Sequence, residues 1–208
     1  GRGCGAAYGV GRAWVDQLKT QEAEHRAQRQ ALIAELQAWA ADNTTAKDGD
    51  WKGFGRVLHE FSQRWRDAGH LGEKAFAQMQ SQWKEVYQAA AAPLEAMQTA
   101  TIEQRKELIA QAQALASEPH LRLDAVRTLQ QRWQAQAQTV PLDRRLEQKL
   151  WDAFRKPIDE TFARKAQERE QAHAALSERD RAVLEAAKAL DAATARADAQ
   201  SGTAIVGR

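Results

Sequence analysis

The segment RQALIAE at residues 29–35 recurs further along the chain as RKELIAQ at residues 105–111. The tripeptide QRW likewise occurs at residues 63–65 and again at residues 131–133. Two pairs of matched segments that keep their order along the chain indicate an internal duplication with a period of about 70 residues.

Two tryptophans extend this match. The interval from Trp83 to Trp151 equals the interval between the two QRW segments, and we call it the repeat interval. The segments RQALIAE and RKELIAQ are separated by slightly more than the repeat interval, because the turn at 42–50, DNTTAKDGD, is longer than its counterpart in the second copy. A third copy begins near the C-terminus, where Leu184 and Leu190 follow Ile109 and Leu115 at one common offset.

Each copy is predicted to consist of helices. In the segment 51–68, apolar residues recur every three to four positions and therefore occupy one helix face. They are Phe54, Val57, Leu58, Phe61 and Trp65. Asp50 is a favourable N-cap residue for this helix, and Gly69 favours its end because glycine tolerates the left-handed cap conformation.

A longer helix is predicted from about Glu73 onward. Pro93 is expected to bend it, because the proline ring removes one backbone hydrogen bond. The apolar stripe fades at residues 98–106, yet no residue there breaks the helix. The closing helix of one copy therefore runs on as the opening helix of the next. The polar stretches 19–30, 98–106 and 164–181 are expected to be exposed struts between small cores.

The second copy also contains residues that end its helices. Ser117-Glu118-Pro119 ends its opening helix, with Pro119 expected in the first turn of the next helix, where proline is accepted. Val140-Pro141 marks the following corner. The predicted core face between these breaks comprises Leu123, Val126, Leu129 and Trp133.

The predicted fold class is all-α, an elongated array of three-helix units joined by long shared helices. Each helix has a narrow apolar face that must pack against neighbours, so each unit buries one small core. We expect an irregular or added tail at residues 1–13, a first repeat unit with a leading strut at 14–97 and a second unit at 98–163. Residues 164–208 are expected to form a helical extension that starts a third unit and ends in a tail.

Most of the seven tryptophans are predicted to be core anchors, because aromatic side chains dominate burial energetics. Stacking on nucleic-acid bases is the alternative. The predicted anchors are Trp39, Trp65, Trp83, Trp133 and Trp151. Trp14 is not firmly assigned to a core. Trp51, at the start of a helix, is a candidate for an exposed contact.

Composition narrows the function classes. A mean hydropathy of -0.67 is polar for a compact globule and favours an extended shape. The net charge of +2, from 30 basic and 28 acidic residues, argues against a strong general nucleic-acid binder. No apolar run approaches the ~20 residues that span a bilayer, and we see no signal peptide. The single cysteine, Cys4, cannot form an internal disulfide, so a reducing cytoplasm is expected.

Residues that carry chemistry are scattered. The five histidines, His25, His59, His70, His120 and His173, show no His-x-x-x-His spacing, whereas metal ligands cluster. Cys4 has no partnering motif, and GRGCG lacks the strand and the Lys-Ser/Thr of a phosphate-binding loop. An acid–base pair needs a pocket that shifts its pKa, which thin three-helix cores rarely offer. We therefore expect no enzyme activity, catalytic residue, metal, cofactor or small-molecule substrate.

The segment LWDAFRKPIDETFARK at 150–165 resembles the bacterial domain-of-unknown-function family 349, whose repeats are helical and of similar length. The matching positions are Trp151, Phe154, Arg155, Asp159, Phe162, Arg164 and Lys165. RWRDAGHLGEK at 64–74 and LIAE at 32–35 also fit, and the resemblance extends over roughly residues 14–190. The first copy departs from the pattern, since Ala91, Leu94 and Ala96 replace Asp159, Phe162 and Arg164. The resemblance implies a bacterial cytoplasmic protein and no established activity.

Charge placement is the most specific functional pattern. Basic stripes can lie along phosphates, although a solvated helix face is the simpler interpretation. The stripe in 51–68 lies opposite the apolar face, contains no acidic residue, and comprises Lys52, Arg56, His59, Gln63 and Arg66. A second group, Arg145, Lys149 and Lys156, is interrupted by Asp152. The stripe is less basic in the second copy, where Asp124 replaces Arg56 and Gln134 replaces Arg66.

These patterns favour a non-enzymatic helical-repeat scaffold or partner-binding module, with a protein as partner and no membrane. The alternative is weak binding to RNA or to the ribosome. The candidate phosphate or partner contacts are Lys52, Arg56, His59, Arg66, Arg145, Lys149 and Lys156.

Overall fold

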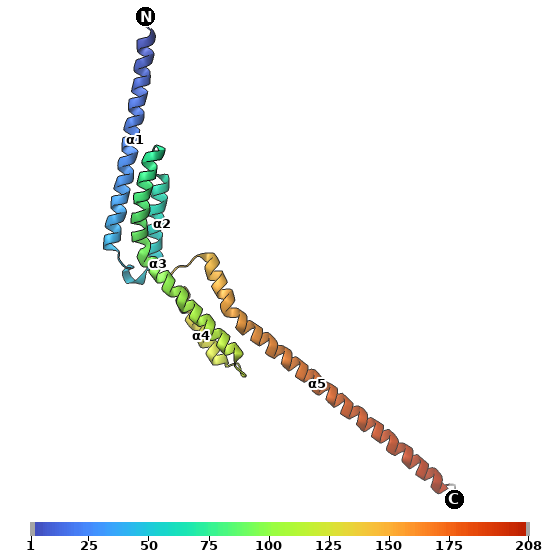
Figure 1. Ribbon diagram of the computed structural model, residues 1–208. Helices are drawn as coiled ribbons and strands as arrows, with labels where there is room; N and C mark the ends of the chain where they lie inside the picture. The colour runs from blue at the N-terminus through green and yellow to red at the C-terminus, as the bar shows by residue number, and fades with distance from the viewer. Residues whose placement is uncertain (1–2, 207–208) are drawn as a thin grey trace.

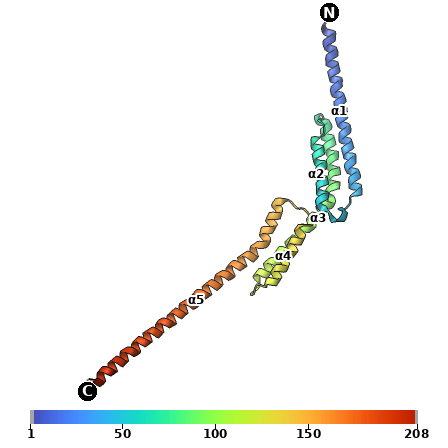
Figure 2. The same cartoon turned by 180° about the vertical axis from the view of Figure 1, so that it is seen from behind.

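The computed structural model describes residues 3–206, which form five α-helices and one 3-10 turn without a β-strand. Figures 1 and 2 show an elongated molecule with its two termini at opposite ends. The predicted all-α, elongated helical array is therefore confirmed. The elements are α1 (Gly3–Asp42), η1 (Lys47–Gly49), α2 (Trp51–Asp67), α3 (Glu73–Ser117), α4 (Leu123–Ala137) and α5 (Arg144–Val206).

The helices pack as two three-helix units that share α3 (Figure 1). The first unit joins the C-terminal half of α1, α2 and the first half of α3, and its core includes Leu36, Phe54, Leu58, Phe61, Trp65 and Trp83. The second unit joins the rest of α3, α4 and the start of α5, and its core includes Leu108, Ala112, Val126, Leu129, Trp133 and Phe154. Each helix thus contributes buried apolar residues to the core of its unit.

The start of α2 follows from its cap. The Asp50 carboxylate accepts a hydrogen bond from the Gly53 backbone N–H at 2.9 Å, as its N-cap position predicts. Trp51 is only 8% exposed, and its ring centroid lies 5.2 Å from that of Phe54. The expectation of an exposed contact at Trp51 is therefore wrong, because the ring folds back onto the core from the first turn.

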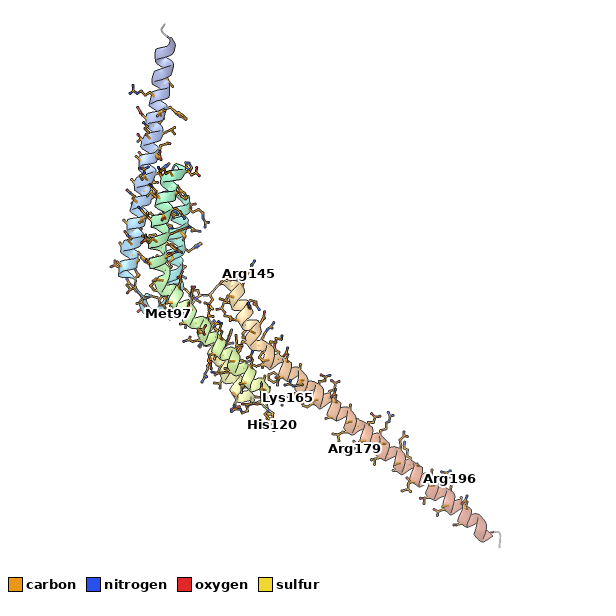
Figure 3. The ribbon with its side chains drawn as sticks, in the orientation of Figure 1. Met97, His120, Arg145, Lys165, Arg179 and Arg196 are labelled. Atoms are coloured by element: carbon orange, nitrogen blue, oxygen red, sulfur yellow. The ribbon has the colours of Figure 1, made fainter. Side chains whose placement is uncertain are left out.

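Helix α3 runs unbroken through Pro93 and changes direction between the two units. Met97, four residues after this proline, is labelled at the bend in Figure 3. The expectation of an exposed strut at 98–106 is wrong at two positions, since Thr101 and Arg105 are 4% and 0% exposed. Arg105 is buried where it pairs with Glu147 of α5, which packs against α3.

The ends of the described chain are helical. The expected tail at 1–13, irregular or added, is not irregular at residues 3–13, which belong to α1, and α5 continues to Val206 instead of ending in a tail. Each glycine lowers helix propensity by only about 1 kcal/mol relative to alanine, and α1 persists through the Gly-rich start. Residues 1–2 and 207–208 lie outside the described range.

Helix α4 begins later than expected. Its first residue is Leu123, so Pro119 lies in the turn before the helix and not in its first turn. Leu123 is 62% exposed, whereas Val126, Leu129 and Trp133 are buried as predicted. Leu123 departs from the predicted core face because it stands at the far end of the second unit.

Candidate partner-binding surfaces

An arginine of α1 caps the C-terminal end of α2 in the first unit. Arg29 is 4% exposed, and its guanidinium carbon lies 4.6 Å from the centroid of the Trp65 ring. Its Nε, Nη1 and Nη2 donate to the backbone oxygens of Gly69 (2.9 Å), Trp65 (3.1 Å) and Ala68 (2.9 Å). The last carbonyls of a helix lack partners within it, so Arg29 satisfies the end of α2. Burial lowers the pKa of Arg29.

The second unit repeats this arrangement with a different acceptor. Arg105 is fully buried, and its guanidinium carbon lies 4.5 Å from the Trp133 ring centroid. Its Nη1 and Nη2 donate to the Glu147 carboxylate at 3.0 and 2.9 Å. In the first unit, the position one repeat interval before Glu147 is the buried Met79. Met79 offers no carboxylate, which explains why Arg29 donates to backbone oxygens instead. The sequence contains one signal for these two buried arginines, since Arg29 and Arg105 occupy the same place in the matched segments RQALIAE and RKELIAQ.

The basic stripe predicted on α2 is exposed to solvent. Lys52, Arg56, His59 and Arg66 are all exposed, on the side of α2 opposite its buried residues. No ion pair engages Lys52, Arg56 or Arg66 in the part of the chain that the structure describes. These side chains are therefore available to an anionic partner.

The basic residues on α5 form a separate group in the second unit. Arg145, Lys149 and Lys156 are exposed, and Arg145 is labelled near the start of α5 in Figure 3. The Lys156 ammonium lies 4.0 Å from the Glu160 carboxylate. Among residues 3–206, no hydrogen bond or ion pair joins this group to the stripe on α2. The seven predicted contacts thus divide between two helices.

An open groove lies at the far end of the second unit, and we call it the distal groove. Its volume is about 470 Å³, and its lining residues are Leu121, Leu123, Phe162, Lys165, Glu168, Arg169 and Ala172. Leu123 and Phe162 are 62% and 38% exposed. Lys165 donates to the Pro119 carbonyl at 3.2 Å and so ties α5 to the turn before α4. Lys165 and His120 mark this end of the unit in Figure 3.

Beyond the groove, α5 projects away from both cores (Figure 3). Leu176, Val183 and Leu190 are 56%, 65% and 68% exposed, and we call these three residues the free stripe. Residues seven apart lie close to one face of a helix, because seven residues make nearly two turns. The second unit buries a pair with the same spacing, Leu108 and Leu115, in its core.

One further ion pair and one histidine contact have structural roles. Arg64 donates from Nη1 and Nη2 to the Glu35 carboxylate at 2.8 and 2.6 Å, which lowers the pKa of Glu35 and raises that of Arg64. His25 Nδ1 lies 2.7 Å from the His70 carbonyl oxygen. Both contacts join α1 to residues near the end of α2.

Two other kinds of site are absent from the described residues. No three or more His, Cys, Asp or Glu side chains there come together as a metal site would require. None of the described helices has the length and hydropathy of a membrane span. The side chain of Cys4 lies outside the described part of the chain.

Two packed three-helix units that share a helix, with open surfaces at the array's end, define a helical-repeat protein. The profile of the family described as Domain of Unknown Function (DUF349) matches the chain twice, at residues 4–74 and 73–141. The chain therefore belongs to this family. The segment 150–165, which resembles the family by its motif, lies outside both matched ranges. Searches of curated proteins and of solved structures returned no significant match.

Proposed function

We propose that this protein is a non-enzymatic scaffold of the cytoplasm that binds a protein partner through the distal groove. The observation that carries the proposal is the exposure of Leu123 and Phe162, two large apolar side chains at the end of a packed core. Contiguous exposed apolar surface marks interaction sites. Covering it contributes about 25 cal/mol for each Å² of apolar area removed from water.

The electrostatics support a binding role over a catalytic one. Catalytic acids and bases have pKa values shifted by burial and by neighbouring charges in a cleft. Among the described residues, the groups with shifted pKa values are Arg29, Glu35 and Arg64. Each of them has a contact that joins α1 to α2 or to the turn after it, so each shift has a structural cause.

Site-specific photo-crosslinking in cells tests the proposal. A photoreactive phenylalanine analogue at Leu123, in the full chain, is expected to capture one discrete protein. The same analogue at Gln130, an exposed position on α4, provides the matched control and should not capture it. Equal capture at both positions, or capture at neither, would contradict the proposal.

A second candidate function is weak RNA binding, and a specific observation favours it. Lys52, Arg56 and Arg66 lie on one exposed face without ion-pair partners among residues 3–206. Such a face can neutralise phosphates in a row. The small net charge of +2 keeps this candidate second, because it limits long-range attraction to nucleic acid.

A further inference from the structure

The junction between the two units shows how this array covers the end of a core. Val140, in the loop between α4 and α5, is 2% exposed and belongs to the core cluster of the first unit. Next to it, the Pro141 carbonyl accepts a hydrogen bond from the Gln98 side chain at 2.9 Å. The corner of the α4–α5 hairpin therefore docks on α3, where the first core ends.

Within residues 3–206, no segment covers the corresponding end of the second core in this way. The repeat interval that relates Trp83 to Trp151 also relates Leu94 to Phe162. Leu94 is 9% exposed, whereas Phe162 is 38% exposed and lines the distal groove. The second unit therefore lacks the contact that the corner of the next hairpin supplies to the first unit.

The free stripe supplies the other half of this docking surface. The repeat interval also relates Leu108 to Leu176 and Leu115 to Val183. In the second unit, Leu108 and Leu115 are buried in the core that α3 forms with α4 and α5. The longer offset noted in the sequence relates Leu115 to Leu190 instead. Leu190 is the next residue of the free stripe, nearly two helical turns after Val183. Both offsets therefore place a free-stripe residue on nearly the same helix face.

We propose that the distal groove and the free stripe together bind a helical hairpin of another repeat unit, with an aliphatic corner residue seated in the groove. This inference deepens the proposed scaffold function by naming the kind of partner. An intact second copy is a poor occupant, because its own corner residues, Leu71 and Val140, are already 3% and 2% exposed. The occupant is therefore a hairpin whose corner is free.

A fusion protein tests this inference without any cellular partner. A second copy of residues 119–161 is joined through a flexible Gly/Ser linker to the C-terminus of the full chain, which raises its effective concentration to about the millimolar range. Hydrogen exchange of peptides covering residues 162–190 is compared with that of the unfused chain. We expect exchange there to slow at least about tenfold, because docking suppresses local opening of the helix.

Two matched variants establish whether the contact is the proposed one. Val140→Asp in the appended copy alone leaves the hairpin's own core residues unchanged and should abolish the protection. Leu123→Lys in the original chain alone should also abolish it, at little cost to folding, because Leu123 is 62% exposed. Unchanged exchange in the fusion, or protection that survives both variants, overturns the inference.

Sedimentation of the unfused chain tests the competing occupant. A monomer over a wide concentration range is expected. A dimer that Leu123→Lys dissociates would show that the groove binds a second copy, which would overturn the hairpin assignment. Failure of the fusion test would leave the photo-crosslinking result unaffected, so the inference and the proposed function fail separately.

Discussion

The guanidinium carbon of Arg105 lies 4.5 Å from the centroid of the Trp133 ring, while the arginine's Nη atoms bind the Glu147 carboxylate. Arg29 makes the same ring contact with Trp65 at 4.6 Å. In each unit the contact joins the opening helix to the middle helix. The duplication has thus preserved a specific interaction as well as a hydrophobic pattern. A desolvated cation–π contact contributes about 2 kcal/mol.

Arg105→Ala is expected to lower the free energy of unfolding by about 2–4 kcal/mol, measured by urea denaturation. Breaking a fully buried ion pair costs about 3–5 kcal/mol, and the cost here is reduced because the Glu147 side chain is 30% exposed. Arg105→Lys should recover only part of the loss, since an ammonium cannot reproduce the planar stacking and the paired hydrogen bonds.

The control for this prediction is Arg26→Ala. Arg26 forms a long 3.9 Å pair with Glu22, and both side chains are about half exposed. Exposed pairs contribute at most about 1 kcal/mol. Equal losses for Arg26→Ala and Arg105→Ala would show that the buried pair is not a stabilising contact.

Trp133→Ala should lower the free energy of unfolding by about 3–5 kcal/mol, because it leaves a cavity in the second core. Trp133 is 3% exposed, and its ring centroid lies 4.4 Å from that of Phe154. Arg145→Ala removes an exposed side chain and should change stability by no more than about 0.5 kcal/mol. Indistinguishable urea melts for the two variants would contradict the assignment of buried and exposed faces.

Glu35→Gln should destabilise the protein near neutral pH and lose its effect in acid. Arg64 lowers the pKa of Glu35 in the folded state. The pair therefore contributes its full stability above the unfolded pKa of about 4.3, and this contribution is lost as pH falls through the lower folded pKa. The expected cost near pH 7 is at most about 1 kcal/mol, since both side chains are about half exposed.

Urea midpoints of wild type and Glu35→Gln, measured from about pH 7 down to pH 3, check this expectation. The equivalent position in the second copy, at the end of RKELIAQ, is Gln111, which carries no titratable group. The Gln111 amide donates only a weak, exposed hydrogen bond of 3.4 Å to the Glu107 carboxylate, so Gln111→Ala should show a nearly pH-independent difference from wild type. A pH-independent difference for Glu35→Gln as well would rule out a role for its ionisation.

The molecule should be long in solution. A compact chain of 208 residues has a radius of gyration of ~17 Å. The projecting part of α5 and the bend between units (Figures 1 and 2) predict a value well above this in small-angle X-ray scattering. A value close to the compact one would show that the units fold back on each other.

If RNA is the partner, binding should be dominated by phosphate contacts. Affinity in an electrophoretic shift assay should then fall steeply with salt and depend little on sequence. The triple variant Lys52→Ala, Arg56→Ala and Arg66→Ala should weaken binding without a change in helicity, because all three side chains are exposed. It should leave crosslinking at Leu123 intact. Absence of binding by wild-type protein at low salt would exclude the RNA candidate.

Local sequence determined most of the helices. The cap at Asp50 and the three-to-four-residue spacing of Phe54, Leu58 and Phe61 depend on residues within one or two turns of each other. The repeat of about 70 residues is likewise visible in the sequence, and it defines the three-helix unit. The basic side chains of the α2 stripe were placed on the solvent face by the same spacing, and they are exposed.

Tertiary structure alone decided which polar residues are buried and which apolar residues stay exposed. Arg29 and Arg105 were part of polar stretches, and they are buried because a tryptophan ring and backbone or carboxylate oxygens from other helices compensate their desolvation. Leu123 belongs to an apolar pattern and remains exposed because, in the described part of the chain, no hairpin corner covers the second unit as Val140 covers the first. Helical periodicity identifies which face of a helix is apolar. Which helix or loop packs against that face depends on residues far away in the chain.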